Sequence, residues 1–96
     1  MVIEWDEAKR HSNLSKHGLD FADAELIFDH DVWEVEDTRD DYGEERIITF
    51  GLLKGRVVIL IYTLRANVVR VISLRKADSD EEQLYFENVF DGLGTD

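Results

Sequence analysis

Apolar residues gather in runs of strand length in the middle of the chain and in wider, helix-like spacing toward both ends. Three runs between residues 45 and 75 are separated by short turns at 54–55 and 65–67, a pattern that predicts three consecutive strands. The middle run, "RVVILIYTL", is apolar at almost every position, so we expect its strand to be covered on both faces. Short stretches at 2–5 and 32–35 are candidates for two further strands.

The first helix is predicted from its two ends. Asp6 can cap a helix that runs from about residue 7 to His17, and Gly18 is well placed to end it in the left-handed conformation. At 100° per residue, one side of this helix collects Ala8, His11, Leu14 and Ser15. The opposite side collects Lys9, Asn13 and Lys16, with His17 at its margin. We therefore expect His11 to be a core histidine and the second side to face solvent.

Two more helices are predicted from caps and apolar stripes. Asp20 can cap a second helix, whose stripe consists of Phe21, Ala24, Ile27 and Phe28. Ser79 and Glu82 have the spacing of a capping box for a last helix that ends at about Val89. Residues 1–90 are therefore predicted to form a single domain, and residues 91–96 a flexible C-terminal tail.

The predicted order of elements, β-α-α-β-β-β-β-α, is typical of the α+β class. We expect two N-terminal helices packed on a mainly antiparallel sheet of three to four strands, followed by a C-terminal helix. The count of strands depends on whether the short stretch at 32–35 joins the sheet.

Composition narrows the class of protein. The chain has 96 residues and no cysteine, which excludes disulfides and thiolate metal sites and fits a reducing cytoplasm. No run approaches the roughly 18–20 apolar residues that cross a membrane. The first ten residues, "MVIEWDEAKR", carry acids where a signal peptide would be apolar. We therefore expect a cytoplasmic protein with no membrane contact.

Charge is distributed unevenly along the chain. The protein has 22 Asp and Glu against 11 Lys and Arg, and its formal net charge is −11. Buried strands lack acids, but they also lack arginines, so a cationic segment without acids indicates an anionic partner or substrate. Residues 46 to 77 contain no acid but hold seven of the cations: Arg46, Lys54, Arg56, Arg65, Arg70, Arg75 and Lys76.

A set of motifs extends along most of the chain. They are "EWDEAKRHSNLSKHGLDFADAELIFDHD", "DYGEERIITFG", "GRVVILIYTLR" and "RVISLRKA", followed by Glu82 and Tyr85. These motifs resemble those of the BrnT family of bacterial toxins. An N-x-x-K-H-G segment next to D-F-x-x-A, upstream of R-x-I-S-x-R-K-A, is a specific combination. The resemblance extends from about Ile3 to Tyr85, which is nearly the whole chain.

The resemblance implies the toxin of a type II toxin–antitoxin pair, a small ribonuclease of RelE-like fold that arrests translation. It also implies a BrnA-type antitoxin with a DNA-binding domain, which would hold the toxin inactive and bind operator DNA together with it in a higher-order complex. One segment departs from the family pattern. The last helix usually starts with basic residues, and here it reads "DSDEEQ". The alternative is therefore a catalytically weakened homologue that binds the antitoxin and acts as a co-repressor.

RNA can be cut without a metal, because its 2′-OH can attack the neighbouring phosphate if protons are transferred and cations face the transition state. Arginine binds phosphate bidentately, so Arg65, Arg70 and Arg75 are the first candidates for catalytic phosphate contact, with ion pairs to acids as the alternative. Tyr62 could contact a phosphate or a base, or could be a core residue. His17 could be the acid or base, or could belong to the helix end "KHG".

Turn lengths predict which of these side chains share a face of the sheet. A two-residue turn at 54–55 places Ile47 opposite Tyr62, and a three-residue turn at 65–67 places Tyr62 opposite Arg70 on one face, with Arg46 on the other. Arg75 and Lys76 lie at the other end of the sheet, roughly 15–20 Å from the end that holds Arg65. The seven cations therefore cannot surround one phosphate. The RNA backbone is therefore assigned to the other cations: Arg46, Lys54, Arg56, Lys76 and, from the first helix, Lys16.

Two acidic clusters, at 29–31 and 37–41, could suggest a magnesium site, but nothing in the sequence fixes octahedral geometry there. We predict no metal and no other cofactor. A third hypothesis, an acidic mimic of DNA, is opposed by the cationic hairpin. The expected partners are RNA and the antitoxin.

Overall fold

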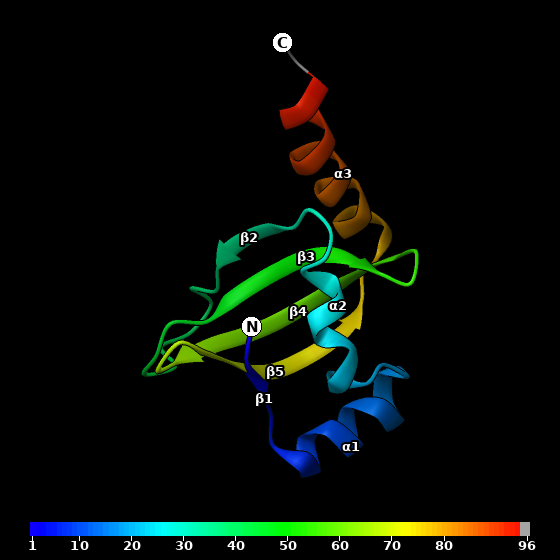
Figure 1. Cartoon of the computed structure of the whole chain (residues 1–96). Helices are drawn as coiled ribbons and strands as arrows, with labels where there is room; N and C mark the ends of the chain where they lie inside the picture. Colours follow the sequence, from blue (N-terminus) through cyan, green and yellow to red (C-terminus); the bar gives the residue numbers. More distant parts are fainter. Residues whose placement is uncertain (95–96) are drawn as a thin grey trace.

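A computed structural model describes the backbone of residues 1–94 and the side chains of residues 1–89. The chain has an α+β fold with a single mixed sheet of five strands. Figure 1 shows the sheet in the middle of the molecule, with α1 near one end and α3 projecting from the other. The elements, in chain order, are β1 (Ile3–Glu4), α1 (Glu7–His17), the 3₁₀ turn η1 (Phe21–Asp23), α2 (Ala24–Ile27), β2 (Trp33–Glu36), β3 (Ile47–Leu53), β4 (Arg56–Arg65), β5 (Val68–Lys76) and α3 (Ser79–Gly94).

The sheet has the strand order β1-β5-β4-β3-β2. The four longer strands are antiparallel to their neighbours, as predicted, whereas β1 lies parallel to β5. The predicted count of three to four strands is wrong, because both short candidates join the sheet. β1 pairs through only two positions, Ile3 with Val69 and Glu4 with Arg70.

Helices cover the two faces of the sheet, and each face has its own core. We call the two faces the α2 face and the α3 face. On the α2 face, Phe21 and Ile27 pack against Leu60 of the central strand. On the α3 face, Tyr85 packs against Ile59. Because both faces of β4 are covered, its sequence is apolar at almost every position, as predicted.

The helix α1 has the predicted boundaries and caps. The side chain of Asp6 accepts a hydrogen bond from the Lys9 amide at 3.1 Å, and Gly18 has φ 72° with its amide bonded to the Leu14 carbonyl. A non-glycine residue rarely adopts this left-handed conformation, so the helix end requires a glycine at this position.

The predicted orientation of α1 is wrong. Asn13, expected on the solvated side, is only 7% exposed, and the His11 side chain, expected in the core, is 74% exposed. The Asn13 amide donates to the carbonyls of Leu19 at 3.0 Å and Leu74 at 2.8 Å, and its oxygen accepts from the Leu74 amide at 3.2 Å. Asn13 thus pairs with the free edge of β5 as a neighbouring strand would, and this pairing turns the polar side of α1 toward the sheet.

The other two helices differ from prediction at their starts or ends. The segment after Asp20 forms the 3₁₀ turn η1 and the four-residue helix α2 instead of one longer helix. The capping box of α3 is formed by Asp78 and Glu81, one residue earlier than predicted, through reciprocal bonds of 2.8 and 2.9 Å. The helix continues to Gly94 rather than ending at Val89. The last two residues of the predicted tail lie outside the described residues.

The two hairpins differ in how well turn length predicts their register. Lys54 and Gly55 form the two-residue turn with positive φ, and Ile47 lies opposite Tyr62 as predicted. The second turn contains only Ala66 and Asn67, with φ 52° and 67°.

The second hairpin therefore has a different register from the predicted one. Its pairing also shifts at a bulge next to residues 72–73 of β5. Tyr62 lies opposite Val71, and Arg70 lies opposite Thr63. Arg70 is thus on the α3 face, and the prediction that it shares a face with Tyr62 is wrong.

Candidate functional site

The cations of the hairpins divide between the two faces of the sheet. Arg75 pairs with Ile59 and Arg70 with Thr63, on the α3 face. Arg65 is on the same face, since alternate residues of β4 point the same way. The cations at the β3–β4 turn and at the end of β5 line a cleft on the α2 face. The acid-free segment therefore forms two separate cationic surfaces.

Each arginine of the α3 face is bonded to a carboxylate from outside the acid-free segment. Arg70 Nη1 lies 2.7 Å from Glu4 Oε2. Arg65 makes a longer pair of 3.3 Å with Glu44.

Arg75 has the strongest of these carboxylate contacts. It donates two hydrogen bonds of 2.8 Å to Glu81, and these bonds lower the pKa of the Glu81 carboxyl. The ion-pair alternative thus describes this conformation for all three arginines. A phosphate that binds here has to displace carboxylates.

Tyr62 is a core residue with a satisfied hydroxyl. It is 7% exposed, and its hydroxyl donates to Glu34 Oε2 at 2.8 Å. Thr49 donates to the same oxygen at 2.6 Å. Burial and the Glu34 carboxylate both raise the pKa of Tyr62, so its proton stays on the oxygen at neutral pH. Tyr62 is therefore separated from the arginines of the α3 face.

His17 and Lys16 lie in a hollow of about 200 Å³ between α1 and β5, which we call the His17 hollow. Lys9 lines it as well, together with the bulged residues Ile72 and Ser73. The rest of the lining comes from Ser12, Asn13 and Phe21. In β5 the bulge stands between Arg70 and Arg75, so a half-buried imidazole, two lysines and an irregular strand meet here.

Helical periodicity placed His17 at the margin of the side that holds Lys9, Asn13 and Lys16, but Lys9 and Asn13 were not expected at the site. Lys9, Asn13 and His17 follow one another at intervals of four residues, which places them on one side of a helix. That spacing was a usable signal. It was outweighed by the expectation that a polar side faces solvent, whereas here the side chain of Asn13 pairs with the edge of β5.

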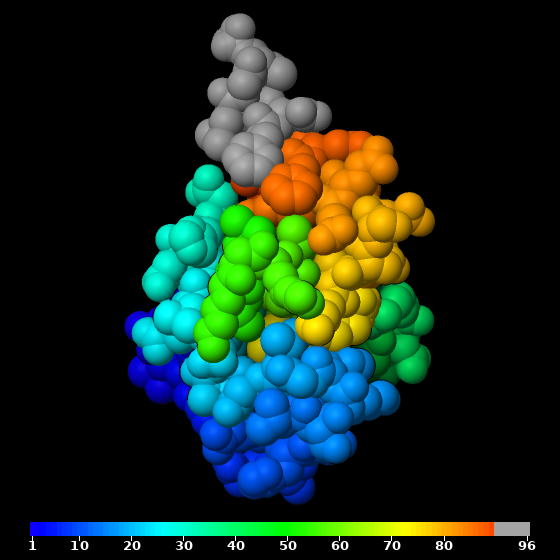
Figure 2. Space-filling view, turned by 90° about the vertical axis from the view of Figure 1, so that its right-hand side faces the viewer, coloured from blue at the N-terminus to red at the C-terminus, as the bar shows by residue number. Residues whose placement is uncertain are grey.

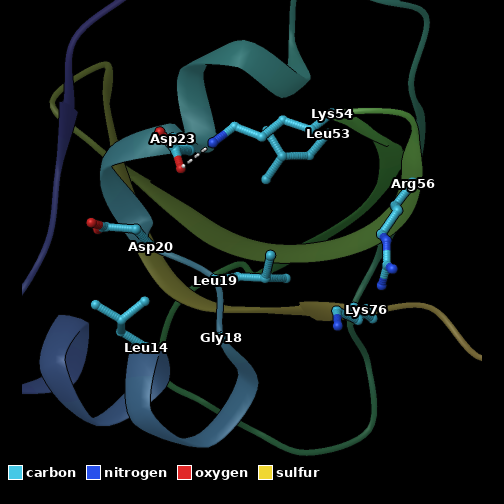
Figure 3. A pocket seen from close by; sticks show the side chains of 9 residues that line it. All are labelled: Leu14, Gly18, Leu19, Asp20, Asp23, Leu53, Lys54, Arg56 and Lys76. Carbon is cyan, nitrogen blue, oxygen red and sulfur yellow. Dashed lines mark hydrogen bonds and ion pairs between the residues drawn. The ribbon is translucent and has the colours of Figure 1, made fainter.

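The second cationic surface is a cleft of about 370 Å³, which we call the turn cleft. Figure 2 looks toward the end of the molecule where the β3–β4 turn (green), α1 (blue) and the end of β5 (yellow) meet. Figure 3 shows Lys54 reaching across to Asp23, at 3.5 Å, with Arg56 and Lys76 on the side away from Asp20. The remaining lining residues are Leu14, Gly18, Leu19 and Leu53.

Arg46 belongs to neither surface. Its guanidinium lies over the ring of Tyr42, 3.9 Å from the centroid, at the start of β3. Its buried Nε has no hydrogen-bond partner among the described residues. A cation–π contact therefore holds Arg46 in place.

The structure brings some of the predicted site residues together and separates others. His17 shares a hollow with Lys16, and three RNA-binding candidates share the turn cleft, while Tyr62 is in the core. Among the described residues, no group of three or more metal-binding side chains is found. No helix in the described part of the chain is long and apolar enough to cross a membrane.

Comparison with models of protein families assigns the chain to a family. Residues 5–81 match a family model described as the ribonuclease toxin BrnT of a type II toxin–antitoxin system. The matched segment includes α1, the His17 hollow and both hairpins. A search of curated proteins finds no relative.

Proposed function

Because the chain belongs to the BrnT family, the ribonuclease toxins of type II toxin–antitoxin systems, we propose that it cleaves RNA without a metal at the His17 hollow. Cleavage in the cytoplasm would inhibit translation, and a BrnA-type antitoxin would neutralise the toxin and bind operator DNA with it in a higher-order complex. We also propose that the fold is RelE-like, as the sequence resemblance implies.

The proposal rests above all on the composition of the His17 hollow. An imidazole exchanges protons near neutral pH, and two lysines in the same lining can neutralise a phosphate. A half-buried position limits the movement of His17 while leaving it accessible to substrate. The hollow therefore unites the two kinds of group that metal-free RNA cleavage needs.

The chemistry would follow the intramolecular route. The 2′-OH loses its proton to a base, its oxygen bonds to the adjacent phosphorus, and the bond from phosphorus to the 5′-oxygen breaks as that oxygen gains a proton. His17 serves as the base or the acid, and Lys9 and Lys16 face the charge on the phosphorane-like transition state. The products are a 2′,3′-cyclic phosphate and a 5′-hydroxyl.

The RNA strand would extend from the hollow along the α3 face. Arg70 and Arg75 flank the bulge in β5, and Arg65 lies at the far end of the hairpin. Phosphates would replace Glu4, Glu44 and Glu81 as partners of these arginines, an exchange between anions that leaves no arginine unpaired. Tyr62 has no direct contact with RNA in this arrangement, because its hydroxyl is buried on the other face.

The test is cleavage of a single-stranded RNA by the purified protein in excess EDTA. We expect cleavage with cyclic or 3′-phosphate ends, and we expect His17→Ala to lower the rate by about 100-fold. His11→Ala is the matched control, since His11 lies on the same helix but its side chain is 74% exposed and outside the hollow. Loss of activity in EDTA with recovery in Mg²⁺ would overturn the metal-free mechanism.

One observation favours a second candidate, a non-catalytic co-repressor that retains the antitoxin interaction. The acidic start of α3 supplies Glu81, which accepts hydrogen bonds from Nη1 and Nη2 of Arg75. If this contact persists in the presence of RNA, the arginine is unavailable to phosphate. Binding of the antitoxin without RNA cleavage by the free protein would support this candidate.

A further inference from the structure

The turn cleft has an apolar floor that is partly open to solvent. Leu53 is 4% exposed and belongs to the core of the α2 face, so this part of the floor is firmly held. Leu14 is 41% exposed although it is a large aliphatic residue. Leu19, which follows the end of α1, is half-buried. An apolar side chain of a partner could therefore bury Leu14 and gain hydrophobic stabilisation.

Of the three cations at the rim of the cleft, two have no carboxylate partner among the described side chains. Lys54 is paired with Asp23 at 3.5 Å. Arg56 and Lys76 have no carboxylate within ion-pair distance among the described side chains, in contrast to the three arginines of the α3 face. The positive charge that the strands leave unpaired on the α2 face is thus concentrated at one edge of the cleft.

The lining of the cleft is better suited to a protein segment than to RNA. It contains no aromatic side chain on which a base could stack. Two carboxylates, Asp20 and Asp23, line the side of the cleft away from Arg56 and Lys76, so a phosphate backbone that crossed the cleft would meet both signs of charge. A peptide can instead place its carboxylates at Arg56 and Lys76 alone. Hydrogen bonds from Arg10 lower the pKa of Asp20 to about 2, so this carboxylate is ionised under ordinary conditions.

We propose that the turn cleft is the docking site for an acidic, amphipathic segment of the antitoxin. An apolar side chain of that segment packs on Leu14, Leu19 and Leu53, and its carboxylates pair with Arg56 and Lys76. The partner named here rests on the proposed function, whereas the site and the chemistry of the segment follow from the cleft.

The positions of the cations fix the orientation of the docked segment. The cations lie at the edge formed by the β3–β4 turn and the end of β5, so the carboxylates point there and the apolar side chain points toward α1 (Figure 3). The net charge of −11 does not prevent the contact, because salt screens distant charges within about 10 Å and the two rim cations act at contact distance. The site is also separate from the arginines of the α3 face, where we located RNA.

The experiment measures the affinity of the purified product of the neighbouring gene for variants of the full chain. Arg56→Glu combined with Lys76→Glu should raise the Kd by about 100-fold, since it places like charges opposite the acidic segment. Leu14→Gln, a change at an exposed helical position, should raise the Kd by about 10-fold. Arg65→Glu is the control on the other face of the sheet, with half the change of charge of the double variant, and should change the Kd less than 3-fold.

Each result assigns the cleft differently. An unchanged Kd for the double variant, with a melting temperature equal to that of the wild type, would overturn the docking site while leaving the toxin–antitoxin pairing intact. An unchanged Kd for the antitoxin with a loss of affinity for single-stranded RNA would assign the cleft to RNA instead. If the wild-type chain does not bind the neighbouring product at all, the pairing in the proposed function fails as well.

Discussion

The α3 face and the turn cleft each hold three cations of the same acid-free segment, but the charges differ in availability. Every arginine of the α3 face holds a carboxylate that comes from another part of the chain. At the cleft, Lys54 has a carboxylate at 3.5 Å, while Arg56 and Lys76 have none among the described side chains. The two regions therefore suit different ligands. The α3 face suits a ligand that displaces carboxylates, and the turn cleft suits a ligand that supplies them.

The difference shows why a stretch of sequence without acids need not be surrounded by free cations. Glu4 reaches Arg70 although 66 positions separate them, because β1 joins the sheet beside β5. Neutralisation depends on which acids the topology brings alongside each cation. The strongest expected effect of substitution concerns helix α1, which lines the turn cleft and packs on β5, the strand that carries Arg70 and Arg75.

Asn13→Ala should disturb both regions at once and lower the free energy of unfolding by about 3 kcal/mol, since it leaves buried backbone groups of Leu74 unpaired. Urea denaturation measures this loss. Ser15→Ala, at an exposed position of the same helix, is the control and should change stability by less than about 0.5 kcal/mol. A loss below about 1 kcal/mol for Asn13→Ala would mean that other contacts hold α1 to the sheet.

Arg75→Ala and Arg65→Ala test whether the paired arginines also serve the reaction. Each should lower kcat/KM for RNA cleavage at least 10-fold, about 1.4 kcal/mol of transition-state stabilisation. Glu44→Gln removes the carboxylate from Arg65 but keeps the arginine, so it should not lower the rate. Folded arginine variants with full activity would show that these residues serve as ion pairs alone.

Glu81→Gln tests the competition between carboxylate and phosphate at Arg75. Removal of the negative charge should tighten RNA binding about 5-fold, or about 1 kcal/mol, at low salt, and the gain should shrink as salt rises. The glutamine oxygen can still accept the capping bond from the Asp78 amide. Glu82→Gln is the neighbouring control, at an exposed position. Equal affinities for the two variants would show that Glu81 does not compete with RNA.

The smallest effect concerns acid stability near the cleft. The pKa of Asp20 is about 2 in the folded chain and 3.8 as its ordinary value, so its contribution to stability is present above pH 3.8 and is lost as pH falls toward 2. Asp20→Asn should therefore unfold more readily than the wild type at pH 5 but differ less at pH 2.5. Thermal melts at both pH values measure this, and an equal difference at both would refute the assigned pKa.

Local signals in the sequence were sufficient to predict much of the fold. Gly18 ends α1 with the predicted positive φ, and Lys54-Gly55 sets the predicted register of the first hairpin. The apolar runs identified the strands, and the motif around His17 identified the family. These features depend on backbone conformation and on residues close together in the chain, which is why they can be read without tertiary structure.

The site depended on contacts that no local pattern contains. The two-residue turn at 66–67 moved Arg70 to the face opposite Tyr62, because one residue of slip reverses every side chain in a strand. The bulge beside Ile72 then placed Arg75 on the same face as Arg70. The unpaired edge of β5 recruited Asn13 and turned the polar side of α1 inward.

The sequence by itself thus determined the strands, the helix ends, the first hairpin register and the family. Tertiary structure decided which cations are neutralised and which side chains share a hollow. The physical reason is the distance along the chain over which each kind of interaction acts. Backbone propensity and turn chemistry act over a few residues, whereas charge pairing and edge-strand pairing join positions as distant as Asn13 and Leu74, which are 61 residues apart.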